Sequence, residues 1–306
     1  MTTLLAVLSL AMLAQIVRSA VPYAAAAIGG VWSERSGVVQ IALEGLLLAS
    51  ALAAVTVHHA TGSAWAGAAA GIFAAAALAA AHAALVVYAG VDPLVNGFAV
   101  NLLAAGLGGV VLRVVYGSET GSPVVSGFAG PWAGATSGPA LLARAIVDPT
   151  TLAAAASIAA TAVILRSTRF GLRLRAAGEG PAAAAAAGIA VERVRAAAIA
   201  VGGAIAGIGG VALAYDEHRF QAVMSGGRGF VALAAVVLSR WRPARAALWC
   251  LLFGALDALR IVLPDRSAVS HEVLEMVPPV VTLLALALVL GRRGAVPPAG
   301  LGKGAR

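Results

Sequence analysis

The sequence contains nine apolar runs, most of them close to the length of a membrane span. They lie at about residues 4–31, 37–57, 64–89, 93–115, 150–165, 193–215, 228–240, 244–263 and 272–290. An α-helix needs about 20 mostly apolar residues to cross the hydrocarbon core of a bilayer. A soluble helical protein needs a charged face on each helix, and these runs have none. The pattern therefore predicts an all-α polytopic membrane protein with about nine transmembrane segments.

Composition agrees with this class. Only 11% of the 306 residues are charged and 61% are hydrophobic, whereas soluble domains carry roughly a quarter charged residues. The first run contains Arg18 and Pro22, so we expect it to be kinked or split in two. The seventh run, 228–240, is short enough to form a re-entrant or half helix.

Two helix starts are marked by the same dipeptide. Asp92 precedes Pro93, and Asp148 precedes Pro149. A carboxylate can cap the free N–H groups of the first turn, and proline is favoured at the first helical position. We therefore expect helices to begin at both prolines.

Basic residues predict the orientation of the chain. The net charge is +8, and arginines in an apolar chain typically mark cytoplasmic loops and anionic headgroups, so nucleic acid is not an expected partner. With the N-terminus outside and the C-terminus inside, fourteen basic residues fall on the inner side and six on the outer side. Arg228 and Arg260 are among the outer six, and residues 292–306 are predicted to be a cytoplasmic tail.

The segment 166–192 sets an arginine-dense stretch between two apolar runs. It includes Arg173 and Arg175, then Glu179 and a block of alanines between Pro181 and Gly188. Proline at the start and glycine at the end predict a short surface helix. The helix either lies on the inner headgroups or docks a soluble partner protein.

Enzyme motifs are absent from the sequence. A P-loop requires GxxxxGK[ST], but the only lysine, Lys303, is followed by glycine. The GxGxxA pattern at 207–212 lies inside an apolar run, where close helix packing explains the small residues better than a dinucleotide site. No HExxH, CxxC or GxSxG occurs. We expect neither an enzyme nor a cofactor or metal site in this chain.

Polar residues inside apolar runs are the candidates for a substrate pathway, because polar groups in hydrocarbon usually face the protein interior. Amide side chains offer donors and acceptors that suit a nucleobase edge or sugar hydroxyls. Hydrogen bonds between helices are the alternative role for them. The candidates are Gln40, Glu44, Asn96 and Asn101, with Phe98 and Phe230 as aromatic residues that stack on a base or else contact lipid.

Other polar residues near the runs have simpler expected roles. Asp257 and Arg260 are three apart and predict an intrahelical ion pair. The acidic and basic residues at 216–219 are expected to be solvated on the outer side. The glycine-rich turn at 226–229 either aims backbone N–H groups at the pathway, as broken transporter helices do, or is a tight loop.

A family resemblance adds to this interpretation. Residues 171–214, GLRLRAAGEGPAAAAAAGIAVERVRAAAIAVGGAIAGIGGVALA, resemble the coupling-loop signature of the branched-chain amino acid and simple sugar permease family of ABC importers. Three further stretches, at 32–50, 92–107 and 227–259, resemble its nucleoside-type branch. The likeness covers most of the chain from about residue 22 to residue 290. Ala185 stands where family members often carry a glutamate.

The resemblance implies a transmembrane permease domain at 1–291, with an external loop at 116–149 and a cytoplasmic coupling helix within 166–192. It implies an ABC ATPase subunit that binds ATP and Mg²⁺, a second permease subunit and an external substrate-binding lipoprotein, all in or at the bacterial cytoplasmic (inner) membrane and its lipids. The expected contacts to the ATPase are Arg173, Arg175, Glu179, Pro181 and Gly188.

The expected activity is nucleoside import by alternating access. A simple sugar such as a pentose is the alternative substrate, because the sugar branch shares the signature. A different class is a stand-alone proton-coupled transporter with Glu44 or Asp257 as relay. A scaffold without transport is a third class.

Overall fold

The computed structural model describes residues 9–130, 134, 138–262, 276, 280–287 and 297–302, and every regular element among them is helical. Six helices are long and apolar enough to cross a membrane. They are α2 (Leu10–Arg35), α3 (Leu43–Thr61), α4 (Ala64–Ala83) continued by the π-helix η1 (Ala84–Tyr88), α5 (Pro93–Tyr116), α7 (Pro149–Ser167) and α10 (Val191–Asp216). The chain is thus a multi-pass helical membrane protein.

Shorter or more polar helices complete the fold. They are α6 (Gly138–Val147), α8 (Arg169–Glu179), α9 (Pro181–Ala186), α11 (Arg228–Leu238) and α12 (Pro243–Val262). The 11-residue α11 confirms the expected short helix. The 20-residue α12 is as long as a span but carries three charged side chains, at 245, 257 and 260.

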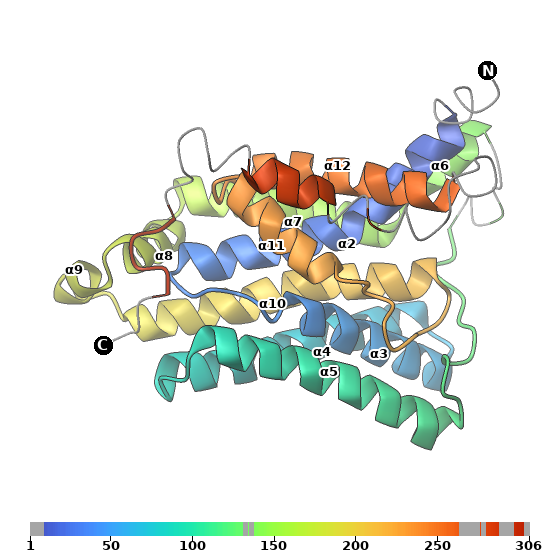
Figure 1. Cartoon of the computed structure of the whole chain (residues 1–306), viewed down its shortest axis with the longest axis horizontal. Helices are drawn as coiled ribbons and strands as arrows, with labels where there is room; N and C mark the ends of the chain where they lie inside the picture. Colours follow the sequence, from blue (N-terminus) through green and yellow to red (C-terminus); the bar gives the residue numbers. More distant parts are fainter. Residues whose placement is uncertain are drawn as a thin grey trace.

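The long helices run side by side along the length of the molecule (Figure 1). α10 lies at the centre and packs against α2, α3 and α4, while α12 packs against α2 and α5 against α3. α8 and α9 lie together at one end of the bundle, which we call the α8–α9 end; α6 lies at the opposite end beside the start of α2 (Figure 1). Most of α2, α3 and α10 is buried, whereas α5 and α7 expose much of their apolar surface.

Small residues let α10 approach its neighbours closely. A Cβ atom at Gly202 would meet the backbone of Gly29 on α2, and one at Gly210 would meet the backbone of Leu47 on α3. Gly207 packs in the same way against α4. The small-residue pattern at 207–212 is therefore a helix-packing surface, as the sequence indicated.

Both predicted helix starts are confirmed. The Asp92 carboxylate accepts from the Leu94 N–H at 2.8 Å and the Val95 N–H at 3.0 Å, ahead of α5. The Asp148 carboxylate accepts from the Thr150 N–H at 2.9 Å, ahead of α7.

The first and last apolar runs differ in outcome. Within its described residues the first run is not split: α2 continues as one 26-residue helix through Pro22. The last, 272–290, lies mostly outside the described residues, of which 280–287 are helical. The count of nine spans and the domain limits therefore stay predictions.

Candidate functional site

The start of α11 is held by Glu44, which lies in the first turn of α3. Its Oε1 accepts hydrogen bonds from the Ser225 hydroxyl at 2.6 Å and the Gly227 N–H at 2.8 Å. Its Oε2 accepts from the Gly229 N–H at 2.7 Å. The first N–H groups of a helix lack partners within the helix and carry partial positive charge, so a carboxylate stabilises them. Two N–H groups of the 226–229 turn, those of Gly227 and Gly229, therefore point at a side chain of the same protein.

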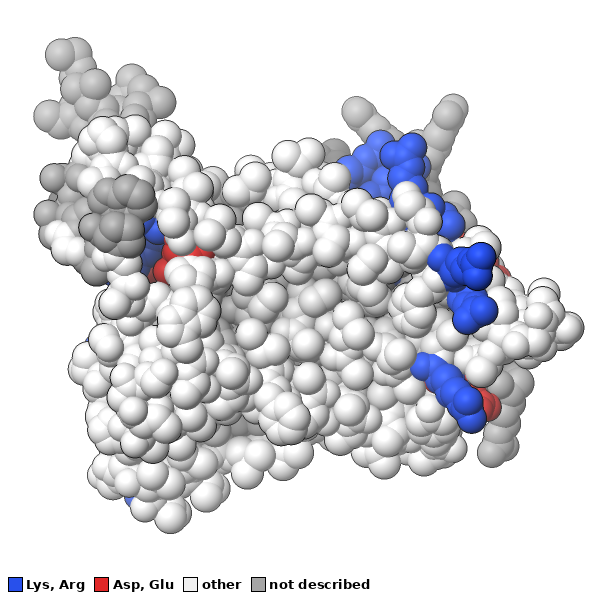
Figure 2. All heavy atoms as spheres, turned by 180° about the vertical axis from the view of Figure 1, so that it is seen from behind, with Lys and Arg blue, Asp and Glu red and all other residues white. Residues whose placement is uncertain are grey.

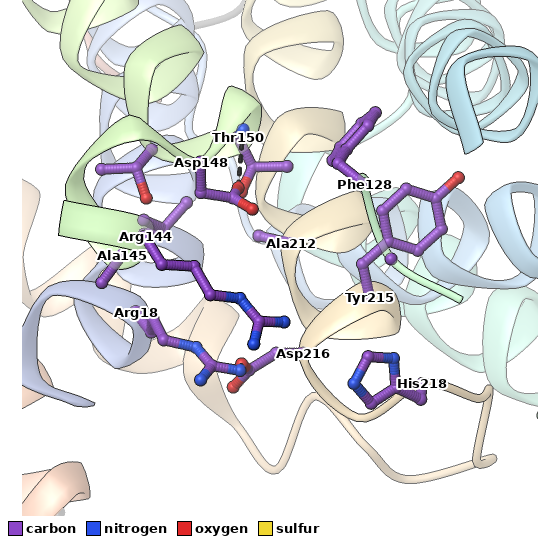
Figure 3. Close-up of a pocket in the computed structure, with 13 residues that line it drawn as sticks. Arg18, Phe128, Arg144, Ala145, Asp148, Thr150, Ala212, Tyr215, Asp216 and His218 are labelled. Atoms are coloured by element: carbon purple, nitrogen blue, oxygen red, sulfur yellow. Dashed lines mark hydrogen bonds and ion pairs between the residues drawn. The ribbon is translucent and has the colours of Figure 1, made fainter. Parts of the chain in front are cut away.

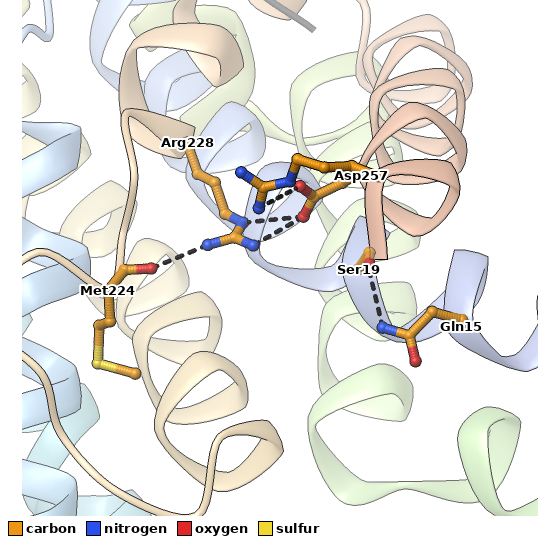
Figure 4. A network of polar contacts seen from close by, with 6 residues as sticks. Gln15, Ser19, Met224, Arg228 and Asp257 are labelled. Atoms are coloured by element: carbon orange, nitrogen blue, oxygen red, sulfur yellow. Dashed lines mark hydrogen bonds and ion pairs between the residues drawn. The ribbon is translucent and has the colours of Figure 1, made fainter. Parts of the chain in front are cut away.

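A buried ion cluster lies at the same helix start (Figure 4). Arg228 donates from Nη2 at 2.7 Å and from Nε at 3.2 Å to Oδ2 of Asp257 on α12. Its Nη1 donates to the Met224 carbonyl at 2.8 Å, and its guanidinium carbon lies 5.9 Å from the centre of the Tyr23 ring. Arg260 contacts the other oxygen, Oδ1, of Asp257 at 2.8 Å. One carboxylate thus faces two arginines.

This cluster corrects one prediction and confirms another. Arg228 is only 9% exposed, so its assignment to the outer surface was wrong. Its partner Asp257 is 29 residues away in the sequence, and helical periodicity relates only residues three or four apart. The side chain of Arg260 is 25% exposed and contacts the same carboxylate. The expected intrahelical pair between Asp257 and Arg260 is confirmed.

The two pathway asparagines on α5 are buried and hydrogen-bonded within the chain. Asn101 accepts from the Gly45 N–H at 2.8 Å and donates to the Ile41 carbonyl at 3.0 Å, so it joins α5 to the start of α3. Nδ2 of Asn96 lies 2.9 Å from Nδ1 of His82 on α4. These contacts are the interhelical bonds that the sequence left open as the alternative role.

Gln40 differs from the other polar candidates. Its side chain is fully buried, and neither its oxygen nor its nitrogen has a hydrogen-bond partner among the described residues. An unpaired buried amide is costly. The Gln40 amide thus has a donor and an acceptor group that no other described residue occupies.

The two aromatic candidates meet on the surface of the chain. The rings of Phe98 on α5 and Phe230 on α11 are 6.4 Å apart between centroids and tilted by 35°. They are 53% and 42% exposed, respectively. Phe230 follows directly after Gly229, so this aromatic pair lies beside the turn that Glu44 holds.

The α8–α9 end has the helix boundaries that the sequence predicted. Pro181 occupies the first position of α9, and Gly188 follows the helix with a positive φ of 79°. An additional helix, α8, precedes it; its first turn is capped by the Thr168 hydroxyl, which accepts from the Gly171 N–H at 3.0 Å. Apart from Ala184, the alanines of α9 are exposed.

Charged residues gather at this end. Figure 2 shows the Lys and Arg side chains concentrated there, with an uncharged surface along the middle of the same face. Arg173 and Glu179 are exposed, and Arg175 is half-buried. Arg173 and Gly188 also line a hollow of about 340 Å³ between α8 and the start of α10.

The junction at 178–181 between α8 and α9, which we call the α8–α9 elbow, packs tightly on the bundle. A Cβ atom at Gly178 would collide with the backbone carbonyl of Arg35 at the end of α2. The Arg35 guanidinium lies 3.8 Å from the Glu179 carboxylate. The next residue after α2, Ser36, is also held: its carbonyl accepts a hydrogen bond at 3.1 Å from Nε of Arg195 on α10.

Residues 297–302, which we call the tail segment, bind this elbow. The Gly300 N–H donates to the Gly178 carbonyl at 2.8 Å, and the Ala299 N–H donates to Glu179 at 3.3 Å. The Gly302 N–H donates to the Gly37 carbonyl at 3.3 Å. No sequence pattern indicated this contact, because all its donors and two of its three acceptors are backbone groups.

A small polar cavity of about 50 Å³ lies at the opposite end (Figure 3). Arg18 on α2 forms an ion pair with Asp216 at the end of α10, so Asp216 is not simply solvated as expected, whereas Glu217 and Arg219 are exposed. Arg144 on α6 also lines the cavity.

The first part of the predicted external loop folds over this end. The Ser122 N–H donates to the Phe220 carbonyl at 2.9 Å, and the Val125 N–H donates to the His218 carbonyl at 2.8 Å. With α6, which packs against α2, these bonds tie the described part of 116–149 to the bundle.

The fold and these elements define a polytopic membrane protein with a half helix held inside the bundle and a short exposed helix at one end. The chain belongs to the permease component family of branched-chain amino acid transport systems, whose model matches residues 12–290.

Named relatives are similar over most of the chain. The nucleoside ABC transporter permease protein NupC of Lactococcus lactis subsp. cremoris (strain MG1363) is 33% identical over 87% of this chain and 87% of its own length. The guanosine ABC transporter permease protein NupQ of Bacillus subtilis (strain 168) is 32% identical over 90% of this chain and 91% of its own length. A putative glucose ABC transporter permease protein, TsgC13 of Haloferax volcanii (strain ATCC 29605 / DS2), is 33% identical over 77% of this chain and 72% of its own length. No solved structure matches the chain.

Proposed function

We propose that the chain is the transmembrane permease subunit of an ABC importer that moves nucleosides inward by alternating access. The observation that carries this proposal is the similarity, along nearly the whole chain, to permeases named for nucleosides and guanosine. A partner ATPase binds ATP and Mg²⁺, a second permease completes the pathway, and an external lipoprotein delivers the substrate.

The α8–α9 end is the docking surface for the ATPase and faces the cytoplasm. The clustered arginines support this orientation through the positive-inside rule. The exposed α9 inserts its alanine face into a cleft of the ATPase, while Arg173, Arg175 and Glu179 make polar contacts. Ala185 gives a smooth apolar contact where related chains often carry a glutamate.

Movement at this surface reaches the bundle through backbone contacts. Gly178 touches the Arg35 backbone, and Arg195 bonds the Ser36 carbonyl. Closure of the ATPase therefore shifts the end of α2 and the following turn, which leads into α3 and to Glu44.

The substrate passes along the surface formed by α5 and α11, which the second permease covers. Phe98 and Phe230 offer faces on which a nucleobase stacks. Gln40 supplies donors and acceptors for the base or ribose once the bundle opens, since its amide is unpaired in this conformation.

A simple sugar is the second candidate substrate, supported by the relative named as a putative glucose permease. Initial uptake of labelled guanosine and of labelled glucose or ribose by the assembled importer decides between them. Each unlabelled compound is tested as competitor of the other. Saturable uptake of a sugar without uptake of guanosine would replace the nucleoside assignment.

The energy source is tested in cells that express the importer. Guanosine uptake that continues in the presence of a protonophore and stops on ATP depletion supports the ABC mechanism. Uptake that stops with the protonophore while ATP remains high would overturn it in favour of proton coupling.

Docking is tested by replacing Arg173 and Arg175 with glutamate. We expect ATP hydrolysis to be uncoupled from guanosine uptake, because two repulsive charges would face the ATPase. The matched control is Arg113→Glu, which changes an exposed arginine at the far end of α5. Normal coupling in the double variant would remove these residues from the docking surface.

A further inference from the structure

The half helix α11 starts inside the bundle, where its free N–H groups would attract an anion. Broken helices in transporters use such ends to bind charged groups of the substrate. Here Glu44 from α3 reaches the N-terminal end of α11 and accepts three hydrogen bonds, from the Ser225 hydroxyl and from the N–H groups of Gly227 and Gly229.

The approach of α3 to α11 is as close as the backbone allows. A Cβ atom at Gly229 would lie 2.6 Å from the Cα of Glu44, so only glycine fits at this position. Glu44 itself is 9% exposed. The carboxylate is therefore held in a fitted site and is not a mobile surface charge.

The remaining charges at this end are also matched within the chain. Arg228 and Arg260 share the Asp257 carboxylate, which is 1% exposed. Together with Glu44, two acidic side chains face two basic ones at the start of α11. The helix end offers no uncompensated positive charge to a passing molecule.

We propose that Glu44 is a positioning residue that fills the positive end of α11 with the chain's own carboxylate. It fixes the orientation of Phe230 in the pathway. Because Glu44 already occupies the N–H groups at the start of α11, they do not bind an anionic group of the cargo. The inference rests on the proposed function for the course of the pathway. Its cargo class is an uncharged polar molecule, such as a nucleoside or a sugar, in contrast to an amino acid or a nucleotide.

The first test is chemical replacement of the carboxylate in the purified full-length chain in detergent. Glu44→Ala removes the acceptor and leaves space for a small anion. We expect a lower midpoint of thermal unfolding, which sodium formate raises saturably at constant ionic strength. Benzoate, which is too large for the vacated space, should not raise it.

Wild-type protein and Glu119→Gln are the controls. Glu119 is an exposed carboxylate paired with exposed Arg113, so its loss removes the same charge outside the bundle. Neither control should show saturable stabilisation by formate. Saturable formate binding by the wild-type chain, or an absent formate effect in Glu44→Ala, would overturn the proposal.

Glu44→Gln covers the case in which the alanine variant does not fold. Its amide places an NH₂ group against an N–H or hydroxyl donor, so we expect initial guanosine uptake to fall about ten-fold while ATP hydrolysis continues. Uptake by Glu44→Gln at the wild-type rate would also overturn the proposal.

The effect of formate on guanosine uptake distinguishes a positioning role of Glu44 from a purely structural one. If Glu44→Ala assembles with its partners, formate should restore part of its guanosine uptake; restored midpoint without restored uptake would contradict a role in positioning the pathway. Failure of the wild-type importer to take up guanosine would instead refute the nucleoside assignment. The formate dependence of the unfolding midpoint would still decide the role of Glu44.

Discussion

Replacement of Asp257 by asparagine should strongly destabilise the protein. The side chain is 1% exposed and bonds Arg228 at 2.7 Å and Arg260 at 2.8 Å. Removal of its charge leaves two arginines facing each other in a buried site. Loss of one partner from a buried ion pair costs about 3–5 kcal/mol. For a chain of this size, that corresponds to a fall on the order of 10 °C in the unfolding midpoint.

The assay is thermal unfolding of the purified chain in detergent, with the exposed pair between Arg113 and Glu119 as reference. That pair has a similar distance of 3.2 Å, but both side chains are at least 70% exposed. Exposed pairs contribute about 0–1 kcal/mol, so Glu119→Gln should hardly change the midpoint.

A combined variant separates the charge from the shape of the site. If the cost comes from the two arginine charges left without the carboxylate, a triple variant with Arg228→Met, Asp257→Leu and Arg260→Met should be more stable than Asp257→Asn alone. The reasoning is refuted if Asp257→Asn unfolds at the same midpoint as Glu119→Gln, or if the triple variant loses the sum of the single effects.

Two further predictions concern the α8–α9 elbow. Gly178→Val should push the elbow off the backbone of Arg35 and lower guanosine uptake per ATP hydrolysed, measured in proteoliposomes. Gly117→Asn, at an exposed position of positive φ at the far end of α5, should keep the ratio near wild type. Deletion of 297–306 should lower the same ratio, because it removes the hydrogen bonds between the tail segment and the elbow. Deletion of 303–306 alone keeps those bonds and serves as the control. Equal ratios for the two deletions would contradict a role for the tail segment.

Much of the helical architecture was predictable from local signals. The apolar runs are long enough to specify spans, and the caps at Asp92 and Asp148 act within three residues, so both were visible in the sequence. The short run at 228–240 similarly predicted α11, because its length is too small for a full span.

The contacts that organise the candidate site were less predictable. Glu44 was singled out as a polar residue in an apolar run, but its partners lie about 180 residues away, on a turn whose N–H groups any sequence would carry. Arg228 was placed outside because it stands at the outer start of the seventh predicted run, and its distant partner Asp257 explains its burial. Long-range pairing of this kind leaves no periodic trace.

The close fit between α10 and its neighbours limits how the bundle can change shape. Where Gly202 rests on Gly29, and Gly210 on the backbone of Leu47, the side chains beside the contact are short, such as those of Ala206 and Ser50, and adjust little as one helix slides past the other. Packed helices accommodate shear through such small side-chain adjustments. Helices α2, α3, α4 and α10 should consequently move together as one rigid block when the ATPase closes, so that the inward and outward states differ in how this block lies against the elements around it.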